Sequence, residues 1–385
     1  MRRLLPGALV TTAVVTGVAL FSAPSGAAPA VVPTALTEPV VVATGLNNPR
    51  QLSVSGTDLY VAEAGTGGSG CGEGGCVGTT GAIAKVSQAY RAKSVTPTRV
   101  VTGLLSAAEG DGSFAVGPDG VSAAELGKLY IAMTYAPPDV LPEGLPGDQA
   151  GKLLVNRLGR TTTVADIAGV EIGTDPDGRG VDSNPYAVLS LPGRQLVADA
   201  AGNSIVEVRA GQAPRVFAVL PEHDGNQAVP TSLAVGRNGD IYVGELNGEN
   251  PGTARVDILS PTGRPVGHVD GFTTISGVAV GTDGTLYVSE LFGGIEDQPS
   301  LRASATAMLD GTRRPAGVTA GRVVASDFDA PGRVTTVRPN GTRTSRNVPL
   351  PAGLAVDAGN HLFVSAWSVL PGFDPEFSGQ VWRLS

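Results

Sequence analysis

Short apolar runs separated by polar turns repeat along the chain. Two clear copies are PTSLAVGRNGDIYVGEL (230–246) and ISGVAVGTDGTLYVSEL (275–291). In each copy a Gly/Asp/Asn turn joins two apolar runs of strand length, which is the signature of a β-hairpin. The pattern also occurs at 49–64, 185–200 and 351–367, and at 113–134, where the insertion VSAAELG divides it. The sequence therefore predicts six hairpins.

Two further strand-like runs follow each hairpin. The third strands are expected at 81–86, 151–158, 204–210, 253–260, 332–339 and 379–385. The fourth strands are expected at 98–104, 161–167, 215–220, 265–272 and 342–350. No fourth strand follows the sixth hairpin, and the N-terminal run PVVVATGL (39–46) supplies a match for it.

Six four-stranded units closed by an N-terminal strand predict an all-β protein, a six-bladed β-propeller. The second-strand valines Val197, Val243 and Val288 are 46 and 45 residues apart, near the span of one blade. A pair of β-sandwiches would not explain six hairpins in phase. Because an incomplete ring cannot close, we expect residues 31–385 to form a single domain.

In a propeller, the loops that lead into the first strands and those that leave the second strands share one face, which we call the loop face. Function is expected there, because scaffolded loops carry binding and catalytic residues. The second strands of four repeats end in an acid, at Glu63, Asp199, Glu245 and Glu290, and Met133 and Ala366 occupy the matching positions. A ring of acids could bind a divalent cation or a polyol. A repeated acid also suits a structural role, in which it accepts backbone N–H bonds at the corner of the blade, and the repeat favours that role.

The lead-in loops share Asn-Pro dipeptides, in NNPRQ (47–51) and SNPYA (183–187). These dipeptides set turns, although Asn48, Arg50, Asn184 and Tyr186 could also contact a ligand above the axis. Long insertions fall on the same face, at 135–149 and at 292–331. The last lead-out loop, 367–379, adds Trp367, Phe373 and Phe377, which suit carbohydrate or pigment contacts or simply pack the loop.

The N-terminal 30 residues have the pattern of a secretory signal peptide. Arg2 and Arg3 precede an uncharged apolar run, and small residues follow up to Ala30. We expect cleavage between Ala27 and Ala30, a secreted or extracytoplasmic protein, and no membrane insertion afterwards. Of 27 basic residues, 25 then remain against 35 acidic ones, a net charge of about −10. Such a chain is a poor nucleic-acid binder, because affinity for phosphate rests on Lys and Arg.

The two cysteines lie in the glycine-rich stretch GTGGSGCGEGGC (65–76). In an exported protein, Cys71 and Cys76 are expected to form a disulfide, and a redox dithiol is the alternative. Two cysteines are too few for a four-thiolate metal site, and the stretch lacks the Gly-Lys-Ser/Thr ending of a phosphate-binding loop.

Familiar catalytic motifs are missing from the sequence. His223, His268 and His361 belong to no HExxH pattern, and there is no GxSxG nucleophile elbow. One enzymatic hypothesis stays open, because some six-bladed propellers are calcium-dependent lactonases or phosphotriesterases. In that case the axial calcium ligands would come from Glu63, Asn184, Asp199, Glu245 and Glu290.

Several stretches together resemble the ScyD/ScyE family, whose repeats are similar to NHL propeller repeats. They are GLNNPRQL (45–52), LYVAEAGTGG (59–68) with the cysteine pair, SNPYAV (183–188), LVADAAGN (196–203), YVGELNG (242–248) and TLYVSEL (285–291). The resemblance covers nearly the whole chain after residue 30. It implies an exported propeller and implies no defined reaction.

These observations favour a non-enzymatic, exported binding or scaffold protein without an evident catalytic constellation. Its partner on the loop face is expected to be a small molecule, a glycan or a protein. The alternative is the calcium-dependent hydrolase, and the two hypotheses differ in whether the acids ligate a metal.

Overall fold

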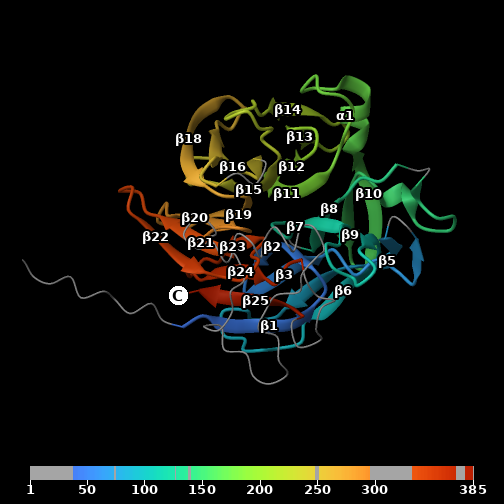
Figure 1. The fold of residues 1–385 in the computed structure, drawn as a ribbon, viewed down its shortest axis with the longest axis horizontal. Coiled ribbons are helices and arrows are strands. Elements are labelled where there is room, and N and C mark those ends of the chain that lie inside the picture. The colour runs from blue at the N-terminus through green and yellow to red at the C-terminus, as the bar shows by residue number, and fades with distance from the viewer. Residues whose placement is uncertain are drawn as a thin grey trace, which may run out of the picture. The chain divides into compact units, whose positions relative to one another are not determined.

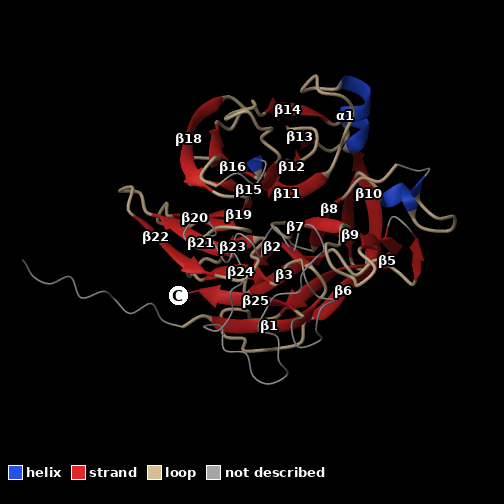
Figure 2. Ribbon diagram, in the orientation of Figure 1, coloured by secondary structure: helices blue, strands red, loops and turns tan. Residues whose placement is uncertain are grey.

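The strands form six antiparallel sheets arranged as a six-bladed β-propeller, as predicted (Figures 1 and 2). The computed structural model describes residues 38–72, 75–125, 127–137, 140–247, 251–294, 332–369 and 378–384. The expected signal peptide, most of the insertion at 292–331, and both Phe373 and Phe377 lie outside these residues. Thr37–Ser385 make up one compact unit.

Each blade runs outward from its first strand to its fourth. Blade 1 contains β2 (Pro49–Ser55), β3 (Asp58–Glu63), β5 (Gly75–Val86) and β6 (Thr98–Ala108). Blade 2 contains β7 (Pro118–Ser122), β8 (Lys128–Met133), β9 (Lys152–Arg157) and β10 (Arg160–Asp166). Blade 3 contains β11 (Pro185–Leu191), β12 (Arg194–Asp199), β13 (Ser204–Val208) and β14 (Arg215–Val219).

The other three blades follow the same order. Blade 4 contains β15 (Pro230–Val235), β16 (Ile241–Glu245), β17 (Ala254–Leu259) and β18 (Pro265–Phe272). Blade 5 contains β19 (Ile275–Val280), β20 (Leu286–Glu290), β21 (Arg333–Val337) and β22 (Arg343–Asn347). Blade 6 contains β23 (Leu354–Val356), β24 (Leu362–Ala366), β25 (Gly379–Leu384) and β1 (Val40–Leu46).

The N-terminal strand closes the ring as expected. β1 pairs antiparallel with β25, with Val40 opposite Arg383 and Leu46 opposite Gly379 (Figure 1). Around the axis the first strands β2, β7, β11, β15, β19 and β23 each contact the first strand of the next blade, and β23 contacts β2. The closing strand therefore pairs an edge of β25 that would otherwise be open.

The core consists of six apolar layers, one between each pair of neighbouring blades. Strand alternation produces this arrangement, because successive side chains point to opposite faces of a sheet. In β12, Leu196 and Ala198 pack toward blade 4, whereas Val197 packs toward blade 2. Each inner strand thus contributes to two layers.

The glycine-rich stretch is more regular than the sequence predicts. A short strand, β4 (Gly70–Gly72), pairs with the start of β5, and both β5 and β6 extend beyond their expected ends. The glycines allow residues 67–68 to lie against β5. A Cβ atom on Gly67 would lie 2.0 Å from the carbonyl oxygen of Cys76, and one on Gly68 would lie 2.3 Å from that of Val77.

Within the described ranges, the helical elements η2 (Gly147–Gln149), in the loop after β8, and α1 (Ala168–Thr174), between blades 2 and 3, were not predicted. In the part of the chain that the structure describes, no helix has the length and apolar character required to span a membrane.

Candidate functional site

The four acids of the sequence repeat occupy equivalent positions at the ends of β3, β12, β16 and β20. Glu63 lies opposite Pro49 in the strand register, and Asp199 lies opposite Pro185. Glu245 and Glu290 lie opposite the first residues of β15 and β19 in the same way. All four side chains are fully buried, so they lie beneath the loop face and are not exposed on it.

Three of these acids hold the lead-in loop of their own blade. The backbone N–H of Asn47 donates to Glu63 Oε2 (2.8 Å), and that of Asn184 donates to Asp199 Oδ1 (2.6 Å). The backbone N–H of Thr273 donates in the same way to Glu290 Oε2 (2.8 Å). Through these bonds the three acids support the corner of their blade, which is the structural role that the sequence favoured.

Arginine side chains form ion pairs with three of the acids, and one of these pairs is Arg255 Nε with Glu245 Oε2, 3.6 Å apart. Arg99 Nη2 lies 2.7 Å from Glu63 Oε2. Arg333 donates to both oxygens of Glu290 at 2.9 Å, and Thr335 Oγ1 donates to Oε1 at 2.6 Å. Glu290 therefore has a full set of donors, whereas Oε1 of Glu63 has no hydrogen-bond partner in the described part of the chain.

Glu245 differs from the other three acids because a histidine side chain takes the place of the backbone donor. His223 Nε2 lies 2.5 Å from Glu245 Oε2, and Asn247 Nδ2 lies 3.0 Å from the same ring nitrogen. Burial and the nearby Asp257 carboxylate raise the pKa of Glu245 well above its usual range. Glu245 and His223 form an acid–imidazole pair at the lead-in loop of blade 4.

Asn184 joins two neighbouring blades. Its backbone binds Asp199, and its side-chain Oδ1 accepts a hydrogen bond from Thr134 Oγ1 (2.8 Å) after β8 of blade 2. Each of the expected calcium ligands is therefore engaged within its own blade or with the adjacent one. Within the described ranges, no three of the four acids bring their oxygens within 4.8 Å of one another. An axial calcium at these residues stays a prediction.

A second set of residues lies on the axis, at the second position of each first-strand repeat. We call it the axial ring, and it consists of Arg50, Asp119, Tyr186, Thr231, Ser276 and Ala352. The rest of the repeat is nearly uniform, but this position changes from blade to blade. That variation in an otherwise regular repeat is visible in the sequence, but only Arg50 and Tyr186 were expected to contact a ligand.

Hydrogen bonds between blades link the axial ring. Thr231 Oγ1 donates to Ile275 O (2.6 Å), and Ser276 Oγ donates to Pro351 O (2.8 Å). Gln51, beside the ring, crosses the axis and donates to Thr231 O (2.9 Å) and Ser276 O (2.8 Å). Thr231 and Ser276 therefore link neighbouring blades, and Gln51 links blade 1 to blades 4 and 5.

Arg50 and Asp119 are the charged members of the axial ring. The guanidinium of Arg50 donates to Ser368 O (2.9 Å) and to Ala115 O, and its Nε lies 3.5 Å from Asp119 Oδ1. Arg50 is thus committed to protein partners. A contact between Arg50 and a ligand stays a prediction.

Asp119 is fully buried, and neither of its oxygens accepts a hydrogen bond among the described residues. Burial raises its pKa to about 7, against the opposing effect of Arg50. Tyr186 is close enough for both charges to act on its phenol, and burial raises the pKa of that phenol. A carboxyl group that titrates near neutrality is typical of functional sites, but buried ion-pair networks also produce it.

The predicted disulfide is present. Cys71 and Cys76 are bonded to each other and lie directly opposite one another in the β4–β5 pair. Cys71 is exposed and Cys76 is buried. The bond therefore closes a small hairpin at the loop face of blade 1.

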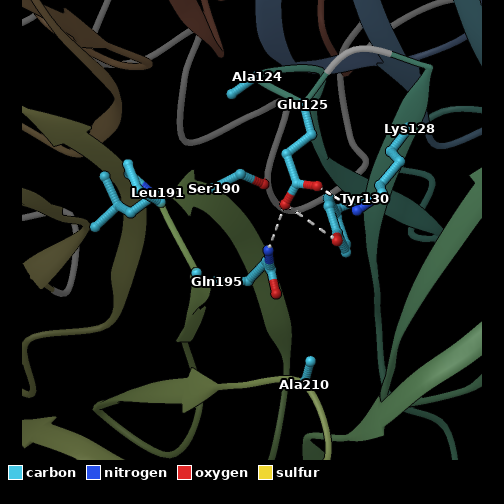
Figure 3. Close-up of a pocket in the computed structure, with 10 residues that line it drawn as sticks. Ala124, Glu125, Lys128, Tyr130, Ser190, Leu191, Gln195 and Ala210 are labelled. Atoms are coloured by element: carbon cyan, nitrogen blue, oxygen red, sulfur yellow. Dashed lines mark hydrogen bonds and ion pairs between the residues drawn. The ribbon is translucent and has the colours of Figure 1, made fainter.

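A surface pocket of about 400 Å³ lies at the other ends of the inner strands, between the hairpin turns of blades 2 and 3 (Figure 3). Glu125 is central in it and contacts Lys128, Tyr130 Oη (3.3 Å) and Gln195 Nε2 (3.2 Å). The hydrogen bond from Lys128 lowers the pKa of Glu125. These groups satisfy one another, so the pocket contains a closed polar network away from the loop face.

No protein-family model matches this sequence, and no curated protein matches it either. Among solved structures, the chain is similar to the PQQ-bound aldose sugar dehydrogenase of Streptomyces coelicolor. That likeness has 13% identity and a TM-score of 0.50, over 91% of this chain and 97% of the other. Virginiamycin B lyase of Staphylococcus aureus is also similar, with 12% identity and a TM-score of 0.44, over 86% of this chain and 82% of the other. At such low identity the comparison shows the β-propeller fold alone, a fold that enzymes share.

Proposed function

We propose that this protein is an exported binding or scaffold protein of the ScyD/ScyE type that presents its loop face to a partner. The observation that carries the proposal is the use of the repeated acids. Glu63, Asp199 and Glu290 are buried and accept backbone N–H bonds from lead-in loops. The scaffold therefore fixes the loops, and a preorganised surface loses less conformational entropy on binding.

The charge of the lead-in loops indicates the chemistry of the partner. Exposed acids on these loops are Glu109, Asp111, Asp182, Glu222 and Asp224. One exposed arginine of the same loops, Arg179, is already paired with Glu222. Complementary potentials steer association, so the proposed partner is a small molecule, glycan or protein with exposed positive charge.

A direct binding experiment tests this proposal. Biolayer interferometry with immobilised chitosan oligosaccharides and lysine-rich peptides should give saturable binding that weakens with salt. The triple variant Glu109→Gln, Asp111→Asn, Asp224→Asn should bind at least about tenfold more weakly, since rim charges govern association. A matched control removes three acids from the hairpin turns of the other face, with Asp240→Asn, Asp283→Asn and Asp357→Asn.

Two outcomes would contradict the proposal. The first is equal loss of binding in the control variant and in the loop-face variant. The second is calcium-dependent turnover of lactone or phosphotriester substrates that Glu245→Gln abolishes. That result would support the hydrolase alternative instead.

A further inference from the structure

The connection between β10 and β11 has no counterpart in the other blades. It contains α1, labelled in Figure 1, followed by the acidic turn DPDGRG (175–180). Asp175 ends the helix in the left-handed conformation (φ 40°), and its N–H donates to Glu171 O (2.8 Å). The turn thereby folds back toward the helical residue Glu171.

This fold brings three carboxyl groups together. One oxygen each of Glu171, Asp175 and Asp177 lies within 4.8 Å of the other two, and within the described residues this is the one such group of three or more acidic, histidine or cysteine side chains. Hydrogen bonds hold the two aspartates in place. The N–H of Gly180 donates to Asp175 Oδ1 (3.2 Å), and Asn203 Nδ2 donates to Asp177 Oδ2 (2.7 Å).

The environment of Glu171 provides a second, independent observation that points to a bound cation. Glu171 is 1% exposed, and among the residues that the structure describes neither of its carboxyl oxygens has a hydrogen-bond partner. The glycine at position 202 leaves room for the Glu171 carboxyl group, because a Cβ atom on residue 202 would lie 2.5 Å from Glu171 Oε2. Burial of an unpartnered carboxyl group is costly unless a positive charge or a donor compensates it.

Among the described residues, no ion pair supplies such a positive charge. In the described part of the chain, none of the three acids forms an ion pair with a lysine, arginine or histidine, and Arg179 of the same turn is paired with Glu222. The pKa of Glu171 rises to about 7 because of its burial and the negative charges of Asp199, Asp177 and Asp175. Asp182 N lies near enough to oppose this rise slightly.

We propose that Glu171, Asp175 and Asp177 bind a calcium ion at the lead-in loop of blade 3. The ligands are all hard oxygens, which favours calcium, magnesium or manganese over zinc or copper. Calcium accepts six to eight oxygens in flexible geometry, whereas magnesium keeps most of its waters and uses one or two carboxylates. Three carboxylates, one from the helix and two from the turn that follows it, therefore suit calcium. The site uses none of the four repeated acids, although Asp199 lies close enough for its charge to act on Glu171, and it does not depend on the proposed partner.

Calcium titration of the full chain, after treatment with EGTA, tests the site. Isothermal titration calorimetry should show one ion bound per chain, and about 1 mM calcium should raise Tm by several degrees. Glu171→Gln should weaken calcium binding at least tenfold. In EGTA, however, the same variant should melt at or above the wild-type temperature, because it removes a buried, unpartnered acid.

Asp177→Asn provides a second variant and should also lose at least tenfold in affinity. Asp224→Asn, on the neighbouring lead-in loop, is the matched control and should bind calcium as the wild type does. The proposal is overturned if calcium leaves Tm unchanged, if magnesium at the same concentration acts equally, or if Glu171→Gln keeps the wild-type response. A calcium response that depends on Glu245 and not on Glu171 would place the ion at the four repeated acids. That result would also overturn the proposal.

Discussion

At the scale of single residues, the repeated acids show how one sequence signal can have different local consequences. Glu290 accepts bonds from Thr273, Thr335 and Arg333. Glu63 has two donors and leaves one oxygen without a partner. The two positions are identical in the repeat, and their neighbours on the third and fourth strands decide what each acid contributes.

Glu290→Gln should therefore lower the free energy of unfolding more than Glu63→Gln does. Removing the charge of Glu290 leaves the bidentate, mostly buried Arg333 without its carboxylate, and losing one partner of a buried pair costs about 3 kcal/mol or more. Glu63→Gln should cost about 1 kcal/mol, because its partner Arg99 is partly exposed. Urea denaturation of both variants measures the difference. Equal losses would contradict this account.

Asp119 should make stability depend on pH. Its pKa rises from 3.8 to about 7 on folding, so the folded state keeps the proton longer than the unfolded chain does. Its contribution to stability is fully present below about pH 4 and is lost as pH rises to about 7, by up to about 4 kcal/mol. Asp119→Asn should remove this loss. The variant should gain stability over the wild type at pH 8 and differ little from it at pH 4.

Urea denaturation at both pH values measures the effect, with Asp224→Asn as a control that changes an exposed acid. If Asp119→Asn is destabilised equally at pH 4 and pH 8, the carboxyl group serves packing alone.

At the scale of elements, the β4–β5 hairpin links the glycine-rich stretch to blade 1. Backbone pairs join Cys71 to Cys76 within the hairpin, and Cys76 to Ala108 of β6. The hairpin is thus held by strand pairing as well as by the disulfide. The sequence identified the bond, and the strand pairing became evident only in the folded structure.

Loss of the disulfide should have a small effect on global stability. Its loop is short, so the double variant Cys71→Ser, Cys76→Ser should lower the free energy of unfolding by about 2 kcal/mol or less. Urea denaturation with and without dithiothreitol provides the measurement, and the double variant should not respond to the reductant. A loss above about 4 kcal/mol would mean that blade 1 depends on the bond for folding.

At the scale of the whole molecule, stability rests on ring closure, since each apolar layer needs two neighbouring blades. β1 contributes Val42, Ala43 and Leu46, all fully buried, to the layer between blades 6 and 1. Removing β1 therefore opens one strand edge and exposes part of this layer.

A chain that begins at Asn47 should be less stable than one that begins at Thr37 by about 5 kcal/mol or more, from the apolar surface it exposes. Its open β25 edge should also favour association between copies. Thermal melting and size-exclusion chromatography measure the two effects. A monomeric shorter chain with an unchanged Tm would show that the ring does not need its closing strand.

The sequence predicted the repeat architecture well for a physical reason. Alternation of apolar side chains and Gly/Asp/Asn turns are local properties, and six copies in phase reinforce one another. The closing strand at 39–46 followed from the same local patterns, whereas the Cys71–Cys76 bond was expected from export of the chain, and both are confirmed. Helix α1 was missed because seven residues without a strong cap give little periodic signal.

The candidate sites were predicted less well, because they depend on contacts between distant residues. Gln51 reaches Thr231 and Ser276 across the axis, far apart in the chain. Asp119 acquires its raised pKa only through burial, against the opposing effect of Arg50. The sequence alone determined the six-bladed propeller, since its strands and turns are encoded locally and repeated. Only the tertiary structure decided which acids support loops and which, like Glu171, are buried without a partner, because burial and charge depend on the blades that pack around each side chain.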